Sequence, residues 1–236
     1  MVKQSISEKI IWIMRNRQLN AMRKSGVEVG KGVVIFSPRY TKIDCSRPWL
    51  LSIGDYTKIT SGVIILTHDY SLSVMRRKYG EWIGEGRKTT IGSNCFIGMN
   101  AIVLAGTNIG DNCIVGAGSV CHGIYPSDSV IAGNPARVIM SLDDYYSRRK
   151  ERTVHEALEC GRLYKGLYAK NPAPSVLSDF KWLFTPRNKE ILMGYGVDSF
   201  YCNGDEPIEV EKAFYESEPY WPSFDDYLKE MNNMEL

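Results

Sequence analysis

An aliphatic residue returns every six positions through the middle of the chain, and this period constrains the fold more than any other feature. Three six-residue segments make one triangular turn, so residues 18 apart stack at about 4.8 Å, the spacing of hydrogen-bonded strands. The period therefore predicts a mainly β protein built as a parallel β-helix. Its members are Val29, Ile35, Ile53, Ile59 and Ile65, then Ile91, Ile97, Val103, Ile109 and Val115.

Small residues follow the late aliphatic positions, and tight corners of a narrow coil need them. We interpret Cys95 and Cys113 as steps of this small-residue ladder and not as a disulfide, because a cytoplasmic protein is reduced. The ladder comprises Cys95, Ala101, Thr107, Cys113 and Ser119. Glycine and asparagine are expected to supply the positive φ angles of the corners. These residues are Gly92, Gly98, Gly110, Gly116 and Gly118 with Asn94, Asn100 and Asn112.

The six-residue phase breaks once, between Ile65 and Ile91. We expect residues 69–88 to leave the coil there as a protruding loop. The loop has aromatic and charged residues that could stack on a sugar, contact an acidic group or pack against a neighbouring subunit, and the sequence leaves these uses open. They are Tyr70, Arg76, Arg77, Tyr79, Glu81 and Trp82.

Composition excludes several classes of protein. The formal net charge of the 236 residues is +2, which gives no overall signature of nucleic-acid binding. No apolar run reaches the length of a membrane span or a secretory signal, so the cytoplasm is the expected compartment. The six cysteines include no CxxC pair and no zinc-site spacing, so no metal is expected. The basic N-terminus and acidic C-terminus either pair or remain solvated, with peripheral membrane contact of the basic helix as the alternative.

Three regions follow along the chain. Residues 1–28 hold a helix, expected over 5–24 with one face formed by Ile6, Ile10, Ile13, Met14 and Arg17, that covers the open end of the coil. Residues 29–139 form the β-helix. Residues 140–236 are a mostly helical extension, in which Ser141 caps a helix to about Gly166 and the Asn171–Pro174 segment breaks it. Two further helices are expected to start at Thr185–Pro186, before KEILM (189–193), and at Ser223, before DDYLKEM (225–231).

The stretch from Ile53 to Ile139 resembles the hexapeptide-repeat acetyltransferases, which are left-handed β-helices. The motifs that carry the likeness are THDY from Thr67, IGSNCFIGMN from Ile91, IGDNCIVGAGSV from Ile109 and AGNPARVI from Ala132. Their order and spacing are most similar to the galactoside, maltose and polysaccharide O-acetyltransferase branch. The resemblance implies a homotrimer that uses acetyl-CoA as acyl donor and a small sugar or glycan as acceptor. The acetyl group would pass directly to a sugar hydroxyl, in the biosynthesis of a surface polysaccharide.

The same resemblance places a catalytic histidine at His68, where the coil register ends. Acetyl transfer to a hydroxyl needs a base that works near pH 7, and histidine is the side chain that fits. His122 and His155 lack this position. A backbone N–H near Gly98 and Met99 is the expected oxyanion donor. Asp69 is expected to orient His68 or the acceptor, or else to cap the loop.

By resemblance, acetyl-CoA lies along a groove between neighbouring β-helices. Its pantetheine arm would contact the backbone at Gly98, Met99, Gly116 and Ala117, and Arg137 would bind the phosphates. The family often has Thr-Lys after GAGSV, where this chain has His122 and Gly123. We expect His122 to substitute in part for that basic residue.

Other functions remain as alternatives. The acceptor could be a nucleotide-linked amino sugar that is N-acetylated, or an antibiotic, although the usual nucleotide-sugar enzymes carry an N-terminal domain that 28 residues cannot form. A non-catalytic trimeric scaffold is the alternative outside the enzymes. A γ-type carbonic anhydrase is disfavoured because three separate histidines form no close pair for zinc.

Overall fold

The computed structural model describes residues 6–188 and 207–233; the KEILM segment and Cys202 lie outside these ranges. The chain divides into two compact units, Met1–Tyr145 and Tyr146–Leu236. Each unit has its own hydrophobic core. They are therefore described separately.

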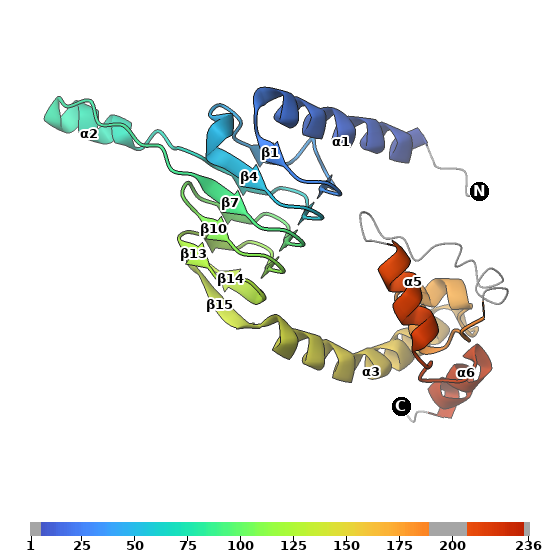
Figure 1. The fold of residues 1–236 in the computed structure, drawn as a ribbon. Coiled ribbons are helices and arrows are strands. Elements are labelled where there is room, and N and C mark those ends of the chain that lie inside the picture. Colours follow the sequence, from blue (N-terminus) through green and yellow to red (C-terminus); the bar gives the residue numbers. More distant parts are fainter. Residues whose placement is uncertain (1–5, 189–206, 234–236) are drawn as a thin grey trace. The chain divides into compact units, whose positions relative to one another are not determined.

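The first unit is a left-handed parallel β-helix with three sheets, one on each side of a triangular prism (Figure 1). Every third strand pairs in parallel, as Ile91 with Ile109 and Ile97 with Val115. Face A contains β1 (Glu28–Val29), β4 (Leu51–Ile53), β7 (Thr89–Ile91), β10 (Asn108–Ile109) and β13 (Ile124–Tyr125). Face B contains β2 (Val34–Ile35), β5 (Lys58–Ile59), β8 (Phe96–Ile97), β11 (Ile114–Val115), β14 (Ser129–Gly133) and the antiparallel β15 (Ala136–Ser141). Face C contains β3 (Lys42–Ile43), β6 (Ile64–Ile65), β9 (Ile102–Val103) and β12 (Val120–Cys121).

The repeated aliphatic side chains point inward and form one buried column. Those from Ile35 to Val115 are at most 2% exposed, and the small residues of the ladder are buried beside them. Cys95 and Cys113 are free thiols whose sulfurs donate to the carbonyls of Gly110 and Pro126. The predicted period and ladder are therefore confirmed for the described part of the chain.

The first coil is irregular in a way that the six-residue phase conceals. Ile43 ends β3 and pairs with Ile65, although it lies eight positions after Ile35 and ten before Ile53. Compared with the regular spacing of six, two residues are inserted before Ile43 and four after it. Together these insertions equal one six-residue repeat, so the sequence keeps its phase across them. The short helix η1 (Pro48–Leu50) occupies the second insertion.

The prediction that the corner glycines supply positive φ angles is wrong for most of them. Asn94, Asn100, Asn112 and Gly118 do have positive φ angles, but the other four corner glycines do not. Instead, these glycines lie directly against the next coil. A Cβ atom on Gly110 would lie 2.5 Å from the backbone nitrogen of Ser127. Close coil stacking therefore selects glycine there.

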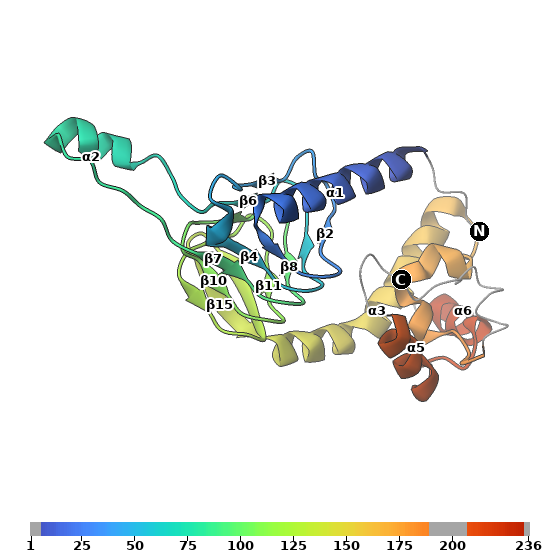
Figure 2. The ribbon, with the colours of Figure 1, turned by 45° about the horizontal axis from the view of Figure 1, so that its top comes forward.

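Helix α1 (Ile6–Ser25) covers the N-terminal end of the prism through its last turns (Figure 2). Leu19 and Met22 join the core of the β-helix, and Gly26 ends the helix with a positive φ angle. The predicted contact face is wrong where it can be judged, because Ile13 is 57% exposed and Met14 and Arg17 are also exposed. Among the described side chains of α1, those that join the core of the coil lie in its C-terminal turns. None of the described helices combines the length and apolarity that a bilayer span requires.

The second unit is helical, as predicted. Its described elements are α3 (Leu142–Tyr168), which begins in the first unit, η2 (Pro174–Leu183), α5 (Pro207–Glu216) and α6 (Phe224–Asn233). The Ser141 hydroxyl accepts a hydrogen bond from the backbone N–H of Asp144, and the Ser223 hydroxyl accepts one from that of Asp226. Both serines therefore cap helices, as expected. Phe184, Trp221, Tyr227 and other buried residues form its core.

Gly110→Ala tests the stacking argument. We expect it to lower the free energy of unfolding by about 2 kcal/mol or more, because the new methyl meets backbone that cannot move aside. Gly84→Ala in the loop is the control, since a Cβ there meets nothing within 4 Å. Urea unfolding of both variants measures the difference. Equal stabilities would contradict the stacking requirement.

Candidate active site

Residues 69–88 form an arm that leaves face C after β6 and returns at β7 (Figure 1). Its centre is the helix α2 (Leu72–Tyr79), a helix that the sequence did not predict. The guanidinium of Arg76 lies 5.1 Å from the ring centre of Tyr70 and 4.4 Å from that of Trp82. Trp82 is nevertheless 85% exposed, so the arm presents an aromatic and basic surface.

His68 lies where the arm departs and is held by a carboxylate from the preceding coil. Because Ile43 pairs with Ile65, Asp44 comes to lie beneath the residues that follow β6. His68 Nδ1 is 2.7 Å from Asp44 Oδ2, with the His68 side chain 35% exposed and the Asp44 side chain 14% exposed. The same Asp44 oxygen accepts hydrogen bonds from the backbone N–H and hydroxyl of Thr67, at 3.2 and 2.5 Å.

These contacts keep Asp44 ionised. Burial alone would raise the pKa of this carboxyl, but hydrogen bonds from Thr67, Ser46 and His68 outweigh burial and hold the pKa well below its usual range. A carboxylate only accepts, so His68 Nδ1 must be the donor. In the neutral imidazole, Nε2 is then unprotonated and available as a base.

Asp69 has a different local role. Its Oδ1 accepts the backbone N–H of Ser71 at 2.8 Å and also the Ser71 hydroxyl. These hydrogen bonds hold the pKa of Asp69 below its usual value. The loop-capping alternative is thus the one the geometry favours, and Asp44 is the functional candidate that sequence reasoning missed. The irregular first coil hid Asp44, because it precedes His68 by 24 positions and not by the 18 of a regular turn.

The predicted donor-binding residues follow one edge of the prism, between faces B and C. Gly98 and Gly116 come directly after β8 and β11, with Met99 and Ala117 next. A Cβ atom on Gly98 would lie 2.6 Å from the Ala117 nitrogen, so these turns stack tightly. The Gly98 N–H donates to the Val115 carbonyl and the Gly118 N–H to the Met99 carbonyl.

Arg137 continues this edge at the end of the stack. It pairs across the hairpin with Ala132, whose Cβ lies against Gly116. The Arg137 side chain is exposed, and its Nη1 donates to the Ala136 carbonyl at 2.8 Å. The structure thus brings Arg137 into line with the four backbone positions.

His122 lies on a different edge. It follows β12 and is exposed, and its backbone N–H donates to the Tyr125 hydroxyl at 3.1 Å. This edge, between faces C and A, also carries His68. Within one chain, face C therefore separates His68 and His122 from the Gly98–Ala117 edge, by roughly 15 Å at about 3.3 Å per residue. Among the described residues no group of three or more His, Cys, Asp or Glu side chains could hold a metal ion.

Comparison with known proteins identifies the repeat. A sequence model described as hexapeptide repeat of succinyl-transferase matches residues 88–121. The Staphylococcus aureus protein named "Protein CapG" is 41% identical over 138 residues, covering 57% of this chain and 77% of that protein. The Bacillus subtilis (strain 168) protein "Putative acetyltransferase YvoF" is 33% identical over 108 residues, covering 46% of this chain and 58% of the relative.

A solved structure with a similar fold is a maltose O-acetyltransferase from Clostridium difficile 630. It is 23% identical, with a TM-score of 0.41, and the match covers 57% of this chain and 83% of that structure.

Asp44→Asn tests the charge of the buried carboxylate. Because the folded-state pKa of Asp44 is depressed, its stabilisation is complete above the unfolded pKa of about 4 and is lost as pH falls through the folded value. We expect the variant to lose about 2 kcal/mol of unfolding free energy at about pH 8. The loss should shrink below about pH 4, as measured by urea unfolding across pH. A pH-independent difference would contradict this.

Proposed function

Since this chain belongs to the hexapeptide-repeat acetyltransferase family, we propose that it transfers an acetyl group from acetyl-CoA to a sugar hydroxyl, with His68 as general base. The observation that supports this most is the hydrogen bond between His68 Nδ1 and the ionised Asp44. It fixes the tautomer in which Nε2 can accept a proton. A β-helix that served only as a scaffold would have no need of it.

The reaction proceeds by direct transfer. His68 Nε2 accepts the proton of the acceptor hydroxyl while the hydroxyl oxygen attacks the thioester carbonyl. The carbon–sulfur bond then breaks, and the CoA sulfur leaves with the proton returned from His68. Asp44 stabilises the imidazolium that exists between these two proton transfers.

The Met99 N–H is the oxyanion donor that we assign. The Gly98 N–H already donates to Val115, whereas among the described hydrogen bonds the Met99 N–H has no backbone acceptor. Met99 is also exposed. A preorganised backbone donor at this edge would stabilise the charge that develops on the thioester oxygen.

The Gly98–Ala117 edge and Arg137 suit the extended shape of the donor. The turns Gly98–Met99 and Gly116–Ala117 stack in successive coils along this edge, and they give an extended pantetheine arm a row of backbone groups to contact. Arg137 lies at the end of this line, where its exposed guanidinium can bind phosphate.

A homotrimer would complete the site, because face C separates the base from the donor edge of the same chain. The outer side of face C carries the half-buried Ile64, Ile102 and Val120, which are in register across three strands. The outer side of face A is more polar, with Ser52, Thr90 and Asn108. Packing around face C would bring His68 of one copy to the donor edge of the next.

His68→Ala tests the base. We expect it to lower kcat for acetyl transfer to sugar acceptors by about 10² or more. A panel of sugars, amino sugars and antibiotics with radiolabelled acetyl-CoA gives both the rate and the acceptor class. Tyr168→Ala, at an exposed position of the second unit, is the control and should retain the wild-type rate. Unchanged turnover by His68→Ala would remove the assignment.

Ile102→Glu tests the trimer. A charge at the centre of the apolar stripe should prevent association, giving monomers in sedimentation velocity and loss of transfer activity. Ile124→Glu, at an outward position on face A that is 81% exposed, is the control and should remain trimeric. Trimeric, active Ile102→Glu protein would show that face C is not the interface.

A further inference from the structure

The second unit contains a groove lined by residues that have no assigned part in acetyl transfer. Its volume is about 1070 Å³, and its walls come from α3, η2 and the segment between α5 and α6. Small-molecule sites commonly have volumes of about 300–1,000 Å³. The groove is therefore large enough for several linked rings of a ligand.

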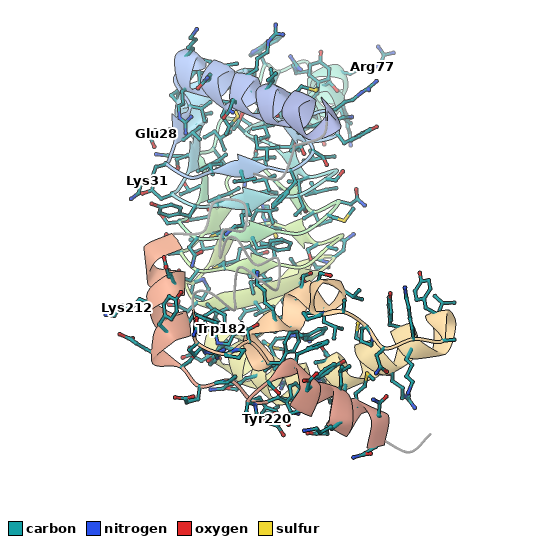
Figure 3. The ribbon with its side chains drawn as sticks, turned by 90° about the vertical axis from the view of Figure 1, so that its right-hand side faces the viewer. Glu28, Lys31, Arg77, Trp182, Lys212 and Tyr220 are labelled. Carbon is teal, nitrogen blue, oxygen red and sulfur yellow. The ribbon has the colours of Figure 1, made fainter. Side chains whose placement is uncertain are left out.

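Aromatic side chains line this groove and are held in place by the core of the unit. Trp182 donates its indole N–H to the Ser217 hydroxyl at 3.2 Å and packs edge-on against Phe214, with ring centres 5.2 Å apart. Tyr220 is 58% exposed and packs edge-on against the buried Trp221 at 4.7 Å. Figure 3 labels both groove residues among the helices of this unit. Such rings offer fixed apolar surfaces at little further cost in entropy.

Charged groups of both signs accompany the rings. Lys150 contributes an ammonium group, while Glu151, Asp179 and Glu218 contribute carboxylates. Arg149 also lines the groove, but its guanidinium makes two hydrogen bonds to Glu156, at 2.9 and 2.7 Å. The lining thus provides acceptors and donors without a net positive charge, which disfavours a phosphate-rich or polyanionic ligand.

From this combination we infer that the groove binds a neutral oligosaccharide. The C–H face of a pyranose ring can stack on the exposed Tyr220, while neighbouring hydroxyls donate to the carboxylates and accept from Lys150. An apolar peptide helix would leave these charged groups unpaired, at a cost. The ligand class rests on the proposed sugar acceptor, and the groove would hold a stretch of an acceptor glycan. Three copies in a trimer would add avidity.

The test is direct binding to the full-length protein. Isothermal titration calorimetry would use neutral hexasaccharides (cellohexaose, chitohexaose and maltohexaose), with hexagalacturonate and an amphipathic peptide for comparison. At least one neutral hexamer should bind wild type, and Tyr220→Ala and Glu218→Gln should each weaken it by about tenfold. Tyr168→Ala, a surface tyrosine of α3 that is 56% exposed and outside the groove, should bind as wild type does.

The contrary results are equally specific. The inference would be overturned if no neutral hexamer bound at millimolar concentration. It would also be overturned if both groove variants bound the hexamer with wild-type affinity, or if the protein preferred hexagalacturonate or the peptide. Circular dichroism identifies a variant that does not fold, and Glu218→Gln at an exposed position then decides. Because the titration contains no acetyl donor, it remains interpretable if acetyl transfer fails. If transfer holds, Tyr220→Ala should raise KM for a hexamer and leave kcat for a monosaccharide unchanged.

Discussion

The spacing between stacked coils is the constraint on which the first unit depends. Parallel strands 18 residues apart must lie at hydrogen-bond distance on all three faces at once, which fixes the size of each turn. Any side chain at a strand-end glycine such as Gly110 would push against the backbone of the next coil. The same spacing determines which side chains from different coils become neighbours.

The His68–Asp44 pair is a direct product of this stacking. Neither residue is close to the other in sequence, and the pairing of β3 with β6 alone brings them together. Thr67 and Ser46 add hydrogen bonds that keep the carboxylate ionised despite its burial. The donor edge arises in the same way, since Gly98 and Gly116 occupy the same corner in successive coils. The scaffold thus supplies both halves of the proposed site without long connecting loops.

The sequence predicted the repeating features most completely, and it missed several contacts that occur only once. The six-residue period predicted the three-sided coil, because every buried aliphatic residue repeats the same physical requirement. It could not reveal Asp44, since the insertions on either side of β3 restore the phase and hide an irregular coil. The contact face of α1 was misplaced because helical periodicity does not show how much of the helix overlaps the coil. The groove of the second unit depends on contacts between distant helices, which no local pattern encodes.

The tautomer of His68 is the measurement that tests this account most directly, because it reports on coil stacking and on the proposed base together. Nitrogen-15 chemical shifts of the imidazole ring in labelled protein distinguish the two neutral forms. The account predicts a proton on Nδ1, donated to Asp44, and an unprotonated Nε2. A proton on Nε2 would show that the first coil does not hold His68 as a base.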